Sequence, residues 1–216
     1  MEASLKISLE NNIMNYNISS IVLAAGMSKR MLIGNKLLLK VKDKTILEKT
    51  LENIIPANFC KISVVLGHDS DFIKDLLKNY KINLYYNLKY KEGVSSSIVE
   101  GVNKNESDSD GIMICLADMP EVSKYVYNKM LSAFQDNYKN GIPLIIIPVH
   151  NKIKGNPVLF SKYFFDDLKK LKGDIGAKKL ILRNEKYIKR INISINSILN
   201  DIDTIAAYDY YIKNEL

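Results

Sequence analysis

Short apolar runs alternate with longer amphipathic stretches along most of the chain. Several runs have strand length and are rich in β-branched residues, which predicts buried strands. The predicted strands cover residues 18–25, 62–67, 82–86, 112–117, 144–149 and, more weakly, 158–160. Further on, Ile191, Ile193 and Ile195 alternate with polar residues, which predicts a half-exposed strand.

The stretches between these runs predict helices. Thr45 and Glu48 form a capping box before an apolar face that ends at Pro56. The other predicted helices cover residues 72–80, 123–138 and 204–212. Strands that alternate with helices predict an α/β fold with three layers, in which helices cover both faces of a mainly parallel mixed sheet. Such sheets bind ligands at the carboxyl ends of their strands.

No linker, repeat or low-complexity tract divides the chain, so residues 18–216 are predicted to form a single domain. Residues 1–17 lack clear periodicity and are interpreted as an N-terminal extension. Met14 opens a segment that would make a natural start. We therefore expect the residues before Met14 to be dispensable for folding.

The composition is that of a globular protein, with 47% hydrophobic and 25% charged residues among 216. No apolar run approaches the ~20 residues that span a bilayer, and the N-terminus lacks the basic and long apolar regions of a signal peptide. We expect a cytoplasmic protein without membrane association. Cys60 and Cys115 lie in or beside apolar runs and are expected to be buried free thiols.

The formal net charge is +7, from 31 basic residues scattered along the chain. Scattered lysines are typical of solvated faces, and the alternative is attraction of an anionic small molecule. Because no dense basic stripe with interleaved aromatic residues is present, we expect no nucleic-acid partner.

The stretch after the first predicted strand has the composition of an anion-binding loop. Small residues at positions 24–26 let the backbone approach a ligand, and Gly26 can adopt a positive φ. Ser28 adds a hydroxyl, Arg30 a forked guanidinium and Lys36 a mobile ammonium. The glycine spacings of Rossmann dinucleotide loops and of P-loops are both absent. The alternative is an ordinary turn with basic residues on the surface.

Two acidic segments offer ligands for a divalent cation. Asp118 ends an apolar strand, and Mg²⁺ prefers one or two carboxylates together with phosphate oxygens. Asp201 and Asp203 point to the same side if their segment is extended. The alternatives are that Asp118 forms a turn or helix cap and that Asp203 or Thr204 caps the last helix.

These segments together resemble a known family. The sequence Leu-Ala-Ala-Gly-Met-Ser-Lys-Arg-Met, followed by Lys36, resembles the opening signature of nucleotidyltransferases with the glycosyltransferase-A-like fold. Residues 112–120 resemble that family's strand ending in Asp-Met-Pro, and residues 201–204 resemble its Asp-x-Asp-Thr. Two features depart from the pattern: the loop before Lys36 is one residue longer, and residues 205–207 replace the usual Pro-Glu-Asp.

Three further segments resemble the branch of molybdenum cofactor cytidylyltransferases and related guanylyltransferases. Residues 93–98 resemble a Gly-x-x-x-Ser segment of the nucleobase pocket, although a serine-capped helix start is the alternative. Residues 155–160 resemble a Gly-Asn-Pro-Val-Leu motif, and residues 173–177 resemble a Gly-Asp-x-Gly-Ala motif on the acceptor side.

The resemblance implies a set of site residues. Nucleotide contacts are expected from Leu23, Ala24, Ala25, Gly26, Met27, Ser28, Arg30, Lys36, Gly67, Ser97 and Leu116. Acceptor contacts are expected from Gly155, Asn156, Pro157, Gly173, Asp174 and Gly176. The implied catalytic residues are Arg30, Lys36 and Asp118, and the implied metal ligands are Asp118, Asp203 and Asp201.

The implied reaction is attack by the phosphate of molybdopterin on the α-phosphate of CTP, with Mg²⁺ or Mn²⁺ and release of pyrophosphate. A molybdoenzyme or a cofactor-delivery chaperone would be the protein partner. The alternatives are a guanylyltransferase, a sugar-1-phosphate nucleotidyltransferase of the same fold, and a non-catalytic module that binds nucleotide or delivers cofactor.

Overall fold

The computed structural model describes residues 16–31 and 34–215, within which eight strands form one mixed sheet. The proposed start at Met14 lies outside the described residues. The strand order is β10-β7-β9-β6-β1-β4-β5, and β8 pairs with β7. The strands are β1 (Ile18–Ala24), β4 (Lys61–Leu66), β5 (Asn83–Tyr86), β6 (Gly111–Leu116), β7 (Ile145–His150), β8 (Ile153–Lys154), β9 (Val158–Ser161) and β10 (Ile188–Asn192). A separate hairpin consists of β2 (Lys40–Val41) and β3 (Lys44–Thr45).

Most strand pairs are parallel. Strand β1 lies between β4 and β6 and is parallel to both, and the β4–β5 and β7–β10 pairs are also parallel. Strand β9 is antiparallel to β6 and β7, and β8 is antiparallel to β7. Because β9 reverses direction between β6 and β7, the parallel strands on both sides of it point the same way. Their carboxyl ends therefore share one edge of the sheet.

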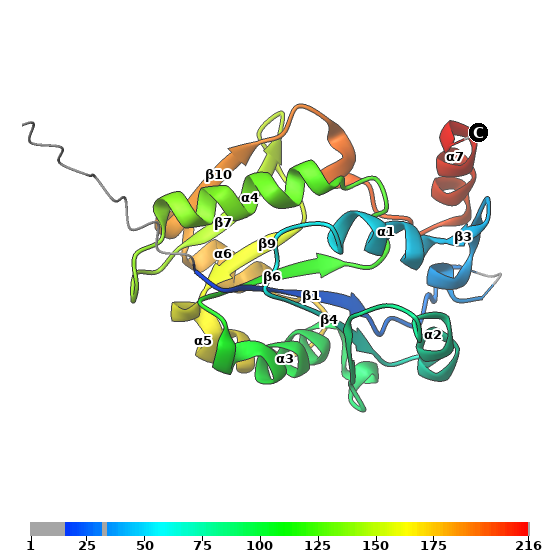
Figure 1. The fold of residues 1–216 in the computed structure, drawn as a ribbon, viewed down its shortest axis with the longest axis horizontal. Helices are drawn as coiled ribbons and strands as arrows, with labels where there is room; N and C mark the ends of the chain where they lie inside the picture. The colour runs from blue at the N-terminus through cyan, green and yellow to red at the C-terminus, as the bar shows by residue number, and fades with distance from the viewer. Residues whose placement is uncertain (1–15, 32–33, 216) are drawn as a thin grey trace, which may run out of the picture.

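Helices cover both faces of this sheet, which confirms the three-layer prediction (Figure 1). The helices are α1 (Ile46–Ile54), α2 (Ser70–Leu76), α3 (Val94–Asn105), α4 (Lys124–Asn137), α5 (Phe165–Lys169), α6 (Lys178–Arg183) and α7 (Ile205–Glu215). Helices α1 and α4 lie on one face, and α3 and α5 lie on the other. No helix among the described residues is both long and apolar enough to cross a membrane.

Alternation along the strands divides the core into two layers. In β1, Val22 packs with the side chains of α1 and α4, whereas Ile21 packs with those of α3 and α5. Gly101 allows α3 to approach β1 closely, because a Cβ there would lie 2.5 Å from Cγ2 of Ile21. A capping box starts α1 as predicted: Glu48 N–H donates to Thr45 Oγ1 at 3.2 Å, and Thr45 N–H donates to Glu48 Oε2 at 2.8 Å.

Three local predictions were wrong. The last strand ends at Asn192 rather than near Ile195, because its partner β7 ends at His150; Ile195 is exposed. Helix α2 ends at Leu76 rather than at residue 80, and Phe72, where the predicted amphipathic helix begins, is 70% exposed. Cys60 is a free but exposed thiol at the start of β4, whereas Cys115 is free and buried as expected.

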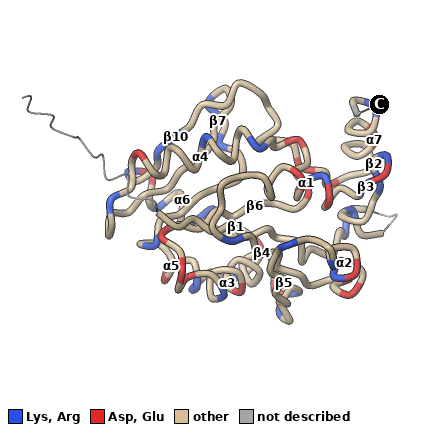
Figure 2. The backbone as a smooth tube through the Cα atoms, viewed as in Figure 1, with Lys and Arg blue, Asp and Glu red and all other residues tan. Residues whose placement is uncertain are grey.

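Charged residues are spread over every layer of the fold. Figure 2 shows Lys and Arg along helices and loops on both sides of the sheet, interspersed with Asp and Glu. The distribution agrees with the scattered lysines of the sequence. Charged residues are concentrated locally, at the carboxyl ends of β1 and β6, and that cluster is described next.

Candidate active site

The loop after β1 turns sharply at Ser28. Ser28 adopts the left-handed conformation, with φ 49°, and its carbonyl accepts the Met31 N–H at 2.8 Å. Gly26, which as a glycine can adopt a positive φ, does not have one; it is exposed, with open space where a Cβ would point. Gly26 therefore does not serve to provide an unusual backbone angle. Its missing side chain instead leaves open space beside the backbone, where, apart from its chain neighbours, no protein atom of the described residues lies within 4 Å of a Cβ position.

A buried amide fixes Lys36 although the preceding loop is long. Asn35 Oδ1 accepts the N–H of Leu37 at 3.1 Å and lies 3.4 Å from Ser28 Oγ, and its Nδ2 donates to Asp69 Oδ2 at 3.2 Å. The N–H of Lys36 donates to Ser28 Oγ at 3.2 Å. The same loop residue that makes the turn therefore also anchors the backbone from which Lys36 extends.

Asp118 lies just beyond β6 on a segment that α1 holds in place. The hydroxyl of Thr50, which is fully buried, donates to the carbonyl of Ala117 at 3.0 Å, and Asn53 Nδ2 donates to the carbonyl of Pro120 at 3.0 Å. The N–H of Ala117 donates to the carbonyl of Leu23 at 3.3 Å. Asp118 is thereby attached to both α1 and the end of β1.

The C-terminal acidic segment joins the site through the residue between its two carboxylates. Ile202 is buried against Val41 of the hairpin, and its N–H donates to the carbonyl of Asp118 at 3.0 Å. Carboxylate oxygens of Asp118, Asp201 and Asp203 all lie within 4.8 Å of one another.

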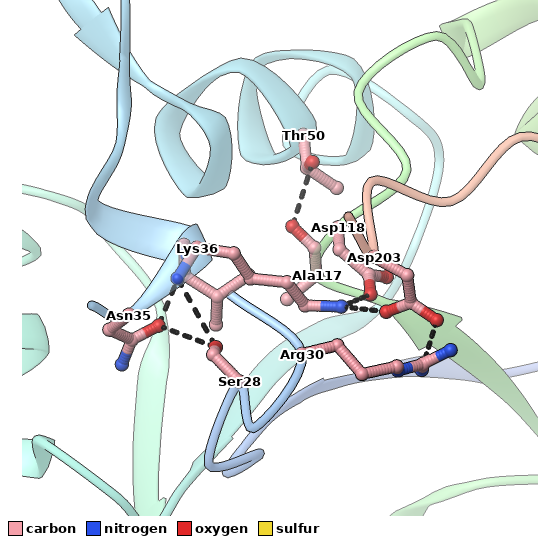
Figure 3. Close-up of polar contacts among 9 residues, drawn as sticks. Ser28, Arg30, Asn35, Lys36, Thr50, Ala117, Asp118 and Asp203 are labelled. Carbon is pink, nitrogen blue, oxygen red and sulfur yellow. Dashed lines mark hydrogen bonds and ion pairs between the residues drawn. The ribbon is translucent and has the colours of Figure 1, made fainter. Parts of the chain in front are cut away.

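Two cations from the loop after β1 contact these carboxylates (Figure 3). The ammonium of Lys36 donates to both Asp118 and Asp203, and the guanidinium of Arg30 donates to the other oxygen of Asp203. Arg30 is largely exposed, with 69% of its side chain accessible, whereas Lys36 is mostly buried. Five charged groups from three separate segments of the chain therefore meet at one point.

The mutual contacts shift the pKa values of three of these groups. Burial lowers the pKa of Lys36, but the charges and hydrogen bonds of Asp118 and Asp203 outweigh burial and raise it overall. Burial raises the pKa of Asp203, but Lys36, Asp201 and Arg30 bring it below its usual range. The pKa of Asp201 is raised by burial and by the neighbouring Asp203 and Asp118 carboxylates.

The donor set suits a hard divalent cation. It consists of three carboxylates and no sulfur or imidazole ligand among the described residues, which is the chemistry that Mg²⁺ and Mn²⁺ prefer. The ammonium of Lys36 already lies between two of the carboxylates, at the position that favours positive charge. The residues present therefore fit the divalent ion that the sequence resemblance implied.

A cavity of about 470 Å³ opens beside this charged cluster. Most of the residues assigned to the nucleotide contribute to its wall: Leu23, Ala25, Gly26, Met27, Ser28, Arg30, Lys36, Ser97 and Leu116. Asp118, Asp203 and Asp174 line it too. Ala24 is fully buried with its side chain in the core, and Gly67 packs behind the wall, where a Cβ would lie 2.6 Å from Cβ of Tyr90.

A second cavity of about 390 Å³ shares Leu23, Val94 and Leu116 with the first. Gly155, Asn156 and Gly176, all assigned to the acceptor, line it. Its wall is otherwise mainly apolar, with contributions from Ile98, Ile114, Ile147, Val158, Phe160, Ile175, Ile181 and Leu182. Pro157 is buried beside this cavity without lining it.

Gly173 and Asp174 have a structural role at the start of α3. Asp174 Oδ1 accepts the N–H of Val94 at 3.1 Å, and the carbonyl of Gly173 accepts the N–H of Ser95 at 3.2 Å. These contacts cap the helix from outside its own segment, and no serine caps it. Asp174 also lines the 470 Å³ cavity and does not line the 390 Å³ one.

Sequence reasoning missed several polar residues that organise the site. They are Asn35, Thr50, Asp69 and Asn87, each of which holds a neighbour rather than lining a large part of a cavity. One signal could have found Asn87: it directly follows a predicted strand, at the edge where ligands bind.

Comparison with known proteins agrees with this geometry. The model of the MobA-like NTP transferase domain matches residues 20–187. The chain belongs to the MobA-like NTP transferase family. It is accordingly a nucleotidyltransferase, as the sequence resemblance predicted.

Individual relatives are distant but cover most of the chain. The molybdenum cofactor cytidylyltransferase of Escherichia coli is 27% identical over 91% of this chain and 98% of its own length. The purine catabolism protein PucB of Bacillus subtilis is 28% identical, over 88% and 93%. A Mycobacterium tuberculosis protein in complex with manganese is 22% identical with a TM-score of 0.77, over 91% and 98%, which shows a shared fold.

Proposed function

We propose that this nucleotidyltransferase transfers CMP from CTP to a phosphorylated small molecule, with molybdopterin as the acceptor. The observation that carries the proposal is the meeting of Asp118 and Asp203 with Arg30 and Lys36 in the wall of the 470 Å³ cavity. The carboxylates suit a divalent ion, and the neighbouring cations suit the phosphate groups of a nucleotide. The carboxyl edge of a parallel sheet is also where such substrates bind.

Asp118 and Asp203 would hold Mg²⁺ or Mn²⁺, and Asp201 would complete the acidic set. Such an ion supplies charge neutralisation and a template for phosphate groups. The manganese complex of the Mycobacterium tuberculosis protein supports a divalent ion in this fold. The short distances among the three carboxylates support it independently.

Arg30 and Lys36 would bind the phosphates of the nucleotide. In the structure, both cations contact Asp203, and Lys36 also contacts Asp118. We propose an exchange in which the carboxylates take the divalent ion and the two cations move to phosphate oxygens. Arg30 is suited to this role because its guanidinium is exposed and can bind two oxygens at once.

The chain's part in the reaction is positioning and charge stabilisation. An oxygen of the acceptor phosphate attacks the α-phosphorus of CTP, the bond to the bridging oxygen breaks, and pyrophosphate leaves with the electron pair. No general base is needed, because a phosphate monoester is already ionised at neutral pH. Arg30 and Lys36 stabilise the charge that builds on pyrophosphate, and the loop of residues 25–28 holds the triphosphate.

The choice of CTP and molybdopterin is supported by the motifs around Asn156 and Asp174 and by the Escherichia coli relative. The PucB relative leaves other acceptors as rivals. The rivals are a guanylyltransferase, a sugar-1-phosphate nucleotidyltransferase, and a non-catalytic module that binds nucleotide and delivers cofactor. We also propose a cytoplasmic location, because a reducing compartment suits a protein with two free thiols. The proposed protein partner is a molybdoenzyme or a delivery chaperone.

Pyrophosphate release tests the proposal. CTP, GTP, ATP and UTP would each be supplied with Mg²⁺, with and without molybdopterin. Release with CTP that requires molybdopterin supports the proposal. Release with another nucleotide favours the matching rival, and thermal stabilisation by a nucleotide without any release would indicate a pure binder.

A further inference from the structure

Asn87 lies directly after β5 with its side chain turned beneath the start of α3. It is 5% exposed, and its backbone N–H donates to the carbonyl of Leu66 at 2.8 Å. Its Oδ1 accepts the N–H of Lys89 at 2.9 Å. Because a backbone N–H can only donate, this contact fixes which side of the amide carries oxygen. The Nδ2 group must therefore face the other way, toward α3.

Both hydrogens of that Nδ2 group have acceptors on α3. The group lies 2.8 Å from Ser96 Oγ and 3.0 Å from Ser97 Oγ. Ser96 in turn donates to a backbone carbonyl, since its Oγ lies 2.9 Å from the oxygen of Lys89 and 2.8 Å from that of Gly93. The direction of every hydrogen bond in this network is thereby fixed, and Asn87 donates to both serines.

Among the described residues, the proton of Ser97 has no acceptor. Within the residues that the structure describes, Asn87 is the only group hydrogen-bonded to Ser97 Oγ, and in that bond Ser97 accepts. Ser97 lines the 470 Å³ cavity. Its hydroxyl can therefore donate one hydrogen bond into the cavity, while Asn87 occupies part of its accepting capacity.

The surroundings of Ser97 suit the base of a nucleotide rather than its phosphates. Val94 lies one helical turn before Ser97, and Leu23 and Leu116 extend the same apolar wall. The cations that would bind phosphates, Arg30 and Lys36, belong to the charged part of the cavity wall, together with Asp118 and Asp203.

We infer that Asn87 is a positioning residue that fixes the Ser97 hydroxyl as a hydrogen-bond donor to the base of the bound nucleotide. This inference rests on the proposed function and adds a chemical requirement to it. The base must present an acceptor at this point, a carbonyl oxygen or an unprotonated ring nitrogen. In CTP these are O2 and N3 of cytosine, and the exocyclic amine cannot serve.

The test replaces the donor with an acceptor of the same shape. Asn87→Asp places a carboxylate where the Nδ2 group donates, so the hydroxyl of Ser97 would turn away from the cavity to donate to it. We expect the KM and the dissociation constant for CTP to rise about tenfold, with kcat changed much less. The matched control is Asn83→Asp: Asn83 is exposed, and within the described part of the chain its Nδ2 donates only to the carbonyl of Ile62, at 3.3 Å.

A double-mutant cycle separates positioning from general damage. If Asn87 acts through Ser97, the CTP affinity of Asn87→Asp combined with Ser97→Ala should lie within about twofold of Ser97→Ala alone. Additive losses would overturn the inference, and so would an unchanged KM in a stably folded Asn87→Asp variant. If that variant unfolds, Asn87→Ala serves in the same cycle, with the same non-additivity expected.

The outcome is distinguishable from failure of the proposed function. Calorimetric binding of CTP in the absence of acceptor measures the role of Asn87 without turnover. CTP binding that the Asn87→Asp substitution weakens, without pyrophosphate release by the wild-type protein, would support the inference while removing the enzymatic proposal. Pyrophosphate release by the wild-type protein, with a KM and a dissociation constant for CTP that the substitution leaves unchanged, would do the reverse. Failure of the wild-type protein to bind CTP would overturn the inference.

Discussion

The ammonium of Lys36 donates to the carboxylate of Asp118 across 82 residues of sequence. Lys36 comes from the loop after β1, and Asp118 comes from the end of the neighbouring parallel strand β6. Asp203 joins them from a segment close to the C-terminus, where Ile202 N–H is bonded to the carbonyl of Asp118. The sheet thus brings a cation and two anions together at one edge, and the charge balance of that group decides what it can bind.

Asp118→Asn should lower turnover by about 10²-fold, because it removes a charged group from the site without changing its shape. Thermal unfolding should show that the variant remains folded. Asp108→Asn is the control, since Asp108 is exposed before β6, at the opposite end of that strand. Near-normal turnover in Asp118→Asn would remove Asp118 from the mechanism.

Lys36→Met should make the stability of the protein more dependent on Mg²⁺. Without metal, we expect a loss of about 1–3 kcal/mol, because two carboxylates lose the cation between them. Added Mg²⁺ should restore part of that loss, since an ion that binds only the native state stabilises it. Denaturant titration with and without Mg²⁺ measures both effects.

Lys44→Met is the control for that experiment. Lys44 pairs with Glu52, but both side chains are 38% exposed. Loss of this ion pair should therefore change the free energy of unfolding little, and the change should be the same with and without Mg²⁺. A Mg²⁺ effect of equal size in Lys36→Met, Lys44→Met and the wild-type protein would contradict competition between the Lys36 ammonium and a divalent ion at Asp118 and Asp203.

The structure also shows why local patterns predicted the elements but not their assembly. The capping box of Thr45 and Glu48 is a contact between residues three apart, so the sequence alone was sufficient to predict it. The apolar runs of β1 and β6 predicted buried strands because parallel strands are covered on both faces. The last strand was misplaced, because the end of β10 depends on where its partner β7 ends.

The site was predictable in its residue types and less so in its contacts. The carboxylates at positions 118 and 203 and the cations at positions 30 and 36 were recognisable from motifs, but their pairing depends on the sheet order. The positive φ occurs at Ser28 rather than Gly26, because the turn is set by the hydrogen bond to Met31. Asn87 escaped notice because its role depends on serines in the next helix.

Thr50→Val should destabilise the protein by about 1 kcal/mol through the loss of a buried hydrogen bond to the carbonyl of Ala117. Because that bond holds the segment before Asp118, turnover should fall as well. Thr50→Ser keeps the hydroxyl and should retain most of the turnover. Urea unfolding and pyrophosphate release, measured on both variants, check the expectation; equal turnover in the two would argue against a link between Thr50 and Asp118.

The two cysteines should react very differently with a thiol reagent. Burial raises the pKa of Cys115 to about 12, so its thiol stays protonated and shielded at pH 8, whereas Cys60 is exposed. We expect rapid labelling of Cys60 alone in the native protein and of both residues in denaturant. Rapid labelling of both in the native protein would contradict the packing of β6.

Mn²⁺ binding followed by electron paramagnetic resonance tests the central claim most directly. The claim is that carboxylates from two distant segments, Asp118 and Asp203, hold one divalent ion together with the nucleotide. In the presence of CTP, we predict that Mn²⁺ binds the wild-type protein and that Asp118→Asn and Asp203→Asn each weaken binding by at least about tenfold. Undiminished Mn²⁺ binding in both variants would contradict the account.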